Sequence, residues 1–162
     1  TDPDKNGGPF QDAMVHNLNK SRYLIGSKVK SVQFTSDNYA QSLKCNDTEM
    51  MRVDFENGAT SLLFITWAAD LEIFDPAGND RVHYGFLHMI TDQGWYITEE
   101  EEAGKPIIKA VKEKKVKTWE VTPLPHNRYD VFSLNLQQGK PQESDVSDAL
   151  IDMQVLDQAM KQ

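Results

Sequence analysis

The segment 50–67, MMRVDFENGATSLLFITW, constrains the fold more than any other part of the chain. Two apolar-rich runs flank Asn57-Gly58, the dipeptide that most readily adopts the positive φ angles of a type I′ turn. In the first run, Met51, Val53 and Phe55 alternate with charged residues, as in a strand with one buried face. The segment therefore predicts an antiparallel hairpin and indicates that the chain is organised around a sheet.

The second arm of the hairpin, 61–67, is apolar on both faces, which is typical of a central strand covered on both sides. Further runs with strand character complete a set of about eight strands. These runs are 28–34, 71–74, 81–91, 95–98, 107–111, 116–122 and 129–136. Because glycine inside a strand usually marks a bulge, Gly85 predicts a bend in the longest of them.

Helical periodicity appears at both ends of this strand-rich region. Phe10, Met14 and Leu18 recur at helical spacing and predict a short helix over 10–21. Residues 145–161 carry five apolar side chains on one side, which predicts an amphipathic helix. These side chains are Val146, Leu150, Met153, Leu156 and Met160.

The order of these elements predicts a mainly β fold. We expect an antiparallel meander, strongly curved or barrel-like, with a short N-terminal helix and an amphipathic C-terminal helix. The alternative is an α+β arrangement in which the helices cover one face of an open sheet. A chain of 162 residues suits a single globular domain, which we place at 10–162 after a flexible, Gly- and Pro-rich lead-in at 1–9.

The charge of the chain limits its partners. Seventeen basic and 25 acidic residues give a net charge of −8, which repels polyanions and disfavours nucleic acid and anionic membranes. A basic protein partner complements this surface, although the charge also serves solubility alone. No run reaches the roughly 20 apolar residues of a membrane-spanning helix. Because the chain starts at Thr1 rather than Met, we expect an exported protein, periplasmic or lipid-tethered, rather than a cytoplasmic one.

An acidic run with two aromatic neighbours supplies the candidate binding residues. They are Trp95, Tyr96, Glu99, Glu100, Glu101 and Glu102. Four adjacent carboxylates do not converge on one point as calcium ligands do, so the run favours recognition of a cationic protein. The alternative is charge neutralisation by the lysine-rich stretch 109–117, with each exposed pair contributing about 0–1 kcal/mol.

Motifs for catalysis or metal binding do not occur in the sequence. There is no HExxH, CxxC or GxSxG pattern and no phosphate-binding glycine loop. The single cysteine, Cys45, excludes an internal disulfide, and His83 and His88 fall on opposite faces of a regular strand. The remaining histidines are His16 and His126. We therefore predict no catalytic residues, no metal and no cofactor.

Together these features predict a non-enzymatic acidic binding module, most simply a protein-binding inhibitor that covers a basic partner. The run from Leu24 to Asp75 resembles the strand order of small bacterial toxin-immunity proteins, which implies a protein that blocks a toxin by covering its active site. The order helix, strands, helix resembles lipocalin-like barrels and implies a carrier of a small apolar ligand. A small hydrolase or lyase whose site the sequence does not reveal is the third possibility.

Overall fold

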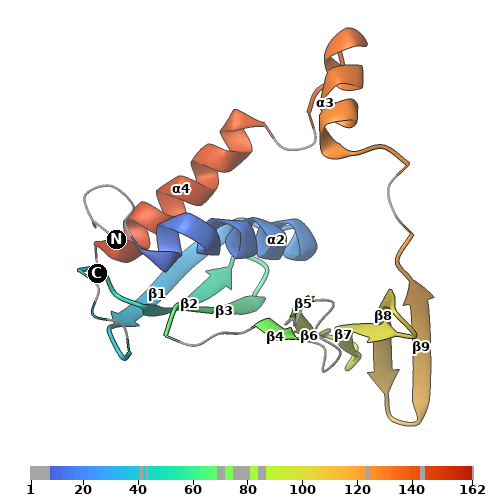
Figure 1. Ribbon diagram of the computed structural model, residues 1–162, viewed down its shortest axis with the longest axis horizontal. Coiled ribbons are helices and arrows are strands. Elements are labelled where there is room, and N and C mark those ends of the chain that lie inside the picture. The colour runs from blue at the N-terminus through green and yellow to red at the C-terminus, as the bar shows by residue number, and fades with distance from the viewer. Residues whose placement is uncertain are drawn as a thin grey trace. The chain divides into compact units, whose positions relative to one another are not determined.

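The computed structural model describes residues 8–40, 42, 44–68, 72–74, 81–83, 87–122, 125–142 and 145–161. The chain groups into two compact units (Figure 1). Unit 1 comprises Thr1–Asp70 together with Gly139–Gln162, and unit 2 comprises Leu71–Gln138. The single domain expected over 10–162 stays a prediction, and most of the expected lead-in at 1–9 lies outside the described residues.

Unit 1 combines three helical segments with a three-stranded antiparallel sheet. The helical segments are the π-helical turn η1 (Phe10–Met14), α2 (Val15–Ile25) and α4 (Val146–Met160). The strands are β1 (Val29–Asp37), β2 (Thr48–Phe55) and β3 (Thr60–Thr66), in the spatial order β1-β2-β3. The first helix and the last one pack against this sheet (Figure 1), so segments from opposite ends of the chain share one core.

The core of unit 1 forms where helical and strand periodicity meet. It contains Phe10, Met14, Leu18, Val32, Met51, Val53, Phe55, Leu63, Val155, Leu156 and Ala159. The rings of Phe10 and Phe34 join the first helix to β1, with 4.5 Å between their centroids. Because apolar burial contributes about 25 cal/mol per Å², this cluster is the main source of stability for unit 1.

The hairpin predicted at Asn57-Gly58 is confirmed, but its turn type is different. Gly58 has a φ angle of +88°, whereas Asn57 is not among the residues with positive φ. The Gly58 N–H donates to the Phe55 carbonyl at 3.0 Å, and the Phe55 N–H donates to the Ala59 carbonyl at 2.9 Å. This is a type I turn followed by a glycine bulge, which places the left-handed conformation on glycine alone.

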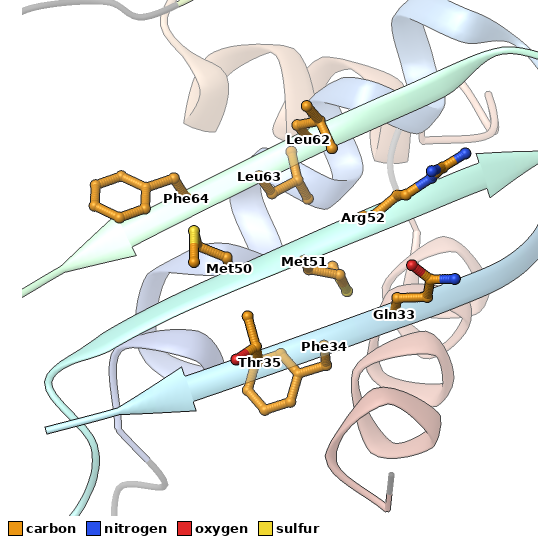
Figure 2. A pocket seen from close by; sticks show the side chains of 9 residues that line it. All are labelled: Gln33, Phe34, Thr35, Met50, Met51, Arg52, Leu62, Leu63 and Phe64. Atoms are coloured by element: carbon orange, nitrogen blue, oxygen red, sulfur yellow. The ribbon is translucent and has the colours of Figure 1, made fainter.

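The second arm, β3, is an edge strand of this sheet rather than the predicted central strand. Leu62 and Phe64 point away from the core and are 79% and 53% exposed. They share the open face of the sheet with Met50 and Arg52 of β2, as Figure 2 shows. The sequence pattern misled because apolar residues on an exposed face look the same as those of a doubly buried strand.

The described residues of unit 2 form two further antiparallel sheets and one helix. Strands β4 (Glu72–Phe74) and β5 (Arg81–His83) form a pair. Strands β6 (His88–Ile90), β7 (Tyr96–Glu102), β8 (Lys105–Lys112) and β9 (Lys115–Glu120) form a meander in chain order, and α3 (Arg128–Gln137) follows. Antiparallel, mainly β architecture is thus confirmed and takes the α+β form, but in the described parts no sheet closes into a barrel.

Two predicted strands differ from the observed elements. The segment 129–136 is helical, because Asn127 caps α3 by accepting hydrogen bonds from the backbone N–H groups of Tyr129 and Asp130. The segment 81–91 contains two short strands, β5 and β6, and Gly85 between them lies outside the described residues. Of the helices that the structure describes, none combines the length and apolar character needed to cross a bilayer.

Candidate functional site

The predicted acidic site lies on β7 of unit 2. Glu99, Glu100, Glu101 and Glu102 are consecutive residues of this strand, so their side chains alternate between its two faces. Glu100 accepts hydrogen bonds from Lys109 Nζ at 3.0 Å and from Thr98 Oγ1 at 2.8 Å. These two bonds, led by the one from Lys109, lower the pKa of Glu100. Neutralisation by a neighbouring strand therefore describes this carboxylate better than an unpaired recognition edge.

The two aromatic candidates have different surroundings. Trp95 is half-buried, with the ammonium of Lys117 4.7 Å from its ring centroid. Tyr96 is 41% exposed, and its hydroxyl contacts His88 Nδ1. The six predicted residues are thus distributed along a strand and its entry rather than gathered around one cavity. Among the described residues, no group of three or more His, Cys, Asp or Glu side chains could hold a metal ion.

Among the pockets formed by the described residues of unit 1, two have a size common for ligand sites. One measures about 460 Å³ and lies on the open face of the sheet, over Met50, Leu62 and Phe64 (Figure 2). The other measures about 700 Å³ and lies beside α2 and α4, where Arg22 and Tyr23 line it. The first offers mainly apolar contacts, whereas the second borders a cluster of charged groups.

That charged cluster joins α2 to α4. The guanidinium of Arg22 bonds Asp152 at 2.6 Å and Asp148 at 2.9 Å. The amide of Asn19 donates to both carboxylates, at 2.8 Å for Asp148 and 2.7 Å for Asp152. The pKa of Asp148 is held below its usual value mainly by the hydrogen bond from Asn19 and, to a smaller extent, by Arg22. Since each charge has partners of opposite sign or polar character, the cluster is suited to holding two helices together rather than to proton transfer.

A carboxylate and an imidazole lie on the solvent side of the first helix. Phe10, Met14 and Leu18 recur every four residues and are buried, whereas Asp12 and His16 fall between them and are exposed. Asp12 lies in the π-helical turn η1 and His16 lies at the start of α2, so about one helical turn separates them. The two side chains therefore share one face. Asp12 belongs to η1, and π-helical turns are frequent at functional sites.

This pair has the chemistry of a proton-transfer site. Histidine is the side chain whose ordinary pKa lies closest to neutral pH, so it can take up and release a proton there. A carboxylate that hydrogen-bonds an imidazole can orient its ring. Both groups are accessible to a solute, because neither is covered by the core on which the helix rests.

A buried carboxyl lies beneath the same helix turn. Glu49 of β2 is only 4% exposed and accepts a hydrogen bond from the backbone N–H of Phe10. Its Oε2 has no hydrogen-bond partner among the residues that the structure describes. Burial raises the pKa of Glu49 to about 7, and the bond from Phe10 opposes that rise. Gly8 passes close by, since a Cβ atom at this position would lie 3.4 Å from Glu49 Oε1.

The sequence patterns did not single out Asp12, His16 or Glu49. A sequence signal for Asp12 and His16 does exist: they are spaced as Asp-x-x-x-His on the polar side of a predicted helix. The sequence signal for Glu49 is its position in the strand alternation. It stands two residues before Met51, so its side chain lies on the core-facing side of the strand.

Comparison with known proteins places these residues in context. A family model described as the GFO/IDH/MocA C-terminal domain matches residues 1–77, just under half of the chain. A search of curated proteins gave no match. Solved structures gave several, each with low sequence identity, so these likenesses show a shared fold.

One similar structure is an aldose-aldose oxidoreductase from Caulobacter crescentus complexed with glycerol (16% identity, TM-score 0.62, 91% of this chain and 44% of that chain). Another is an oxidoreductase from Agrobacterium radiobacter in complex with NAD⁺, L-tartaric acid and magnesium (14%, 0.62, 94% and 46%). A third is the WlbA dehydrogenase from Bordetella pertussis in complex with NADH and UDP-GlcNAcA (16%, 0.52, 95% and 43%). This chain spans less than half the length of each of these proteins.

These matches show that the predicted function was wrong. The matched domain and the similar structures are those of oxidoreductases, not of inhibitors, immunity proteins, lipocalin-like carriers, or hydrolases and lyases. The predicted basic protein partner and apolar ligand fail with it, because the similar structures hold nicotinamide dinucleotides and polar small molecules. The error arose from treating net charge as a sign of partner choice, although charge primarily reflects solubility.

Proposed function

We propose that this chain is the substrate-binding part of an NAD(P)-dependent oxidoreductase that acts on a polyhydroxylated, sugar-like substrate, with Asp12 and His16 as its proton-transfer pair. The family match over residues 1–77 supports the reaction class and contains both side chains. Glycerol, tartaric acid and a sugar nucleotide in the similar structures support the substrate class.

The chemistry of alcohol oxidation gives the pair a role. Converting a secondary alcohol to a ketone removes a hydride from carbon and a proton from the hydroxyl oxygen. The nicotinamide dinucleotide is the hydride acceptor in this reaction class. The proton requires a base, and histidine is the side chain most often used as a general base, which makes His16 the candidate. Asp12, one turn earlier, orients that imidazole and stabilises its positive charge after proton uptake.

The residues of this chain do not fit a dinucleotide site of their own. The sequence has no G-x-G-x-x-G pattern. In the described parts all strand pairs are antiparallel, whereas dinucleotide sites of this type use parallel βαβ units. Under this proposal the dinucleotide is held by another part of a longer polypeptide, in keeping with the share of the similar proteins that this chain covers.

The observation that carries the proposal is the exposed position of His16 beside Asp12, on a helix within the matched region. The other histidines with described side chains, His88 and His126, belong to unit 2 and lie outside that region. His88 is moreover engaged with the Tyr96 hydroxyl. Position and solvent access therefore favour His16 as the base.

We expect His16→Gln to lower kcat by about 10²- to 10⁴-fold, the usual contribution of a general base, while the fold is retained. The assay follows NADH or NADPH formation by absorbance in the polypeptide that includes the dinucleotide-binding part, with glycerol, L-tartrate, aldoses and UDP-sugars as substrates. His126→Gln is the matched control, because it removes an exposed imidazole from unit 2. Full turnover by the His16 variant, or no dinucleotide reduction with any of these substrates, would contradict the proposal.

A further inference from the structure

The first turn of the helix rests on a polar side chain of the sheet. Glu49 lies on the middle strand, where it is in register with Ser36 of β1 and Ile65 of β3. Its side chain leaves β2 on the face that carries Met51 and Val53, and this face is covered by the helices. A carboxyl therefore occupies a core position directly below η1.

Two contacts fix the start of the helix at this point. The N–H of Phe10 bonds the Glu49 carboxyl, and the ring of Phe10 packs on Phe34. The first N–H groups of a helix have no partner within the helix, so an acceptor from outside is needed there. A negative charge at this end is also favoured by the helix dipole.

We propose that Glu49 is a positioning residue for the Asp12–His16 pair: its carboxyl fixes the helix turn that carries Asp12, and the protonation state of this carboxyl sets how firmly the turn is held. This inference rests on the proposed function only for its link to catalysis. The contact between Glu49 and the helix stands on the structure of unit 1 alone.

The two protonation states hold the turn differently. An ionised carboxylate makes a shorter and stronger bond to an N–H group than a neutral carboxyl does. The pKa of about 7 means that both states are populated near neutral pH. Among the described residues, the titratable side chains on the surrounding segments include Asp12, Asp37, Cys45 and Asp47, and the Asp47 carboxylate accepts hydrogen bonds from the N–H groups of Tyr39 and Ala40.

The experiment follows the backbone amides of Phe10 and Asp12 and the ring of His16 by NMR, in the full chain, from about pH 5 to 8.5. We expect the Phe10 amide to shift with a midpoint near that of Glu49. Glu49→Gln keeps the size and an acceptor oxygen but removes the titration, so the Phe10 shift should become flat and the ring resonances of His16 should change. Glu56→Gln, which removes an exposed carboxylate from the hairpin turn, should change neither.

A Phe10 amide that stays constant across this range in the unaltered chain would overturn the proposal, and this result needs no variant to fold. An unchanged Phe10 titration in Glu49→Gln would overturn it as well. In the active polypeptide, Glu49→Gln should alter the pH profile of kcat and leave KM within about twofold. If His16→Gln retains turnover, the proposed function fails; if only the pH profile is unmoved by Glu49→Gln, the positioning role fails.

Discussion

At the scale of single residues, unit 1 differs from an ordinary apolar core because it buries acidic side chains. Unit 1 buries the carboxyl groups of Asp47, Glu49 and Asp152. Asp47 accepts bonds from two backbone N–H groups and the Thr48 hydroxyl, and Asp152 is bonded by Arg22 and Asn19. Glu49 has one oxygen without a partner among the described residues. Strand alternation could have placed Glu49 inside, but a sequence pattern does not reveal whether a buried carboxyl has partners.

The buried carboxyl makes stability depend on pH. Burial raises the pKa of Glu49 from 4.5 to about 7, so the folded chain binds more protons than the unfolded chain between these values. The free energy of unfolding therefore falls as the pH rises from about 4.5 through 7. At 1.36 kcal/mol per unit, the fall amounts to at most about 3 kcal/mol. Urea unfolding at about pH 5 and pH 8 should show this fall in the unaltered chain and its absence in Glu49→Gln. The same pH dependence in both would contradict the assignment.

At the scale of elements, local rules predicted those segments whose signals agree with one another. The hairpin at Asn57-Gly58, the first helix and the last helix each combine periodicity with a turn or cap residue. The segment 129–136 failed because its apolar residues fit either period, and the cap at Asn127 decided for helix. The exposure of one face of β3 could not be predicted from its own sequence, because whether another element packs on this face depends on the rest of the chain.

The charged cluster that joins α2 to α4 gives a prediction at this scale. Asp152→Ala leaves the guanidinium of Arg22 in a site where its side chain is only 14% exposed. Because Arg22 keeps its bond to Asp148, the loss is that of a charged hydrogen bond, about 2 kcal/mol in the free energy of unfolding. Asp157→Ala on the same helix breaks only an exposed pair with Lys161 and should cost about 0.5 kcal/mol or less. Urea unfolding of both variants measures this difference. Equal losses would show that the charged cluster stabilises unit 1 no more than an exposed ion pair does.

For the whole molecule, the two units differ in how much they bury. The core of unit 1 draws on both helices and all three strands of its sheet. In the described part of unit 2, the buried side chains are Thr98, Ile107 and Ala110, and every residue of β9 is exposed. The antiparallel, mainly β prediction is confirmed, but the described strands form separate sheets instead of one barrel-like meander, because strand alternation specifies faces and not which strands share a core. The proposed reaction class was equally out of reach of the sequence analysis, since an Asp-x-x-x-His spacing on a helix is too common to identify one.

This difference predicts unequal protection from hydrogen exchange. Local stability follows buried apolar contact, so amides of β2 should exchange at least about 100-fold more slowly than those of β8 and β9. Mass-spectrometric exchange on the intact chain measures both sheets in one sample. Equal protection of the two sheets would mean that unit 2 draws its stability from contacts other than its own buried side chains.

The interleaved order of the units has a consequence for synthesis. Unit 1 is completed by α4, whose Val155, Leu156 and Ala159 enter its core, yet all of unit 2 is translated between β3 and that helix. While residues 71–138 are being translated, the nascent chain lacks α4. The core side chains that α4 later covers, such as Leu18 and Val53, are therefore incompletely buried during this time. A message cut short before α4 would therefore release a polypeptide with an unsealed apolar surface, the kind of product that chaperones and proteases remove.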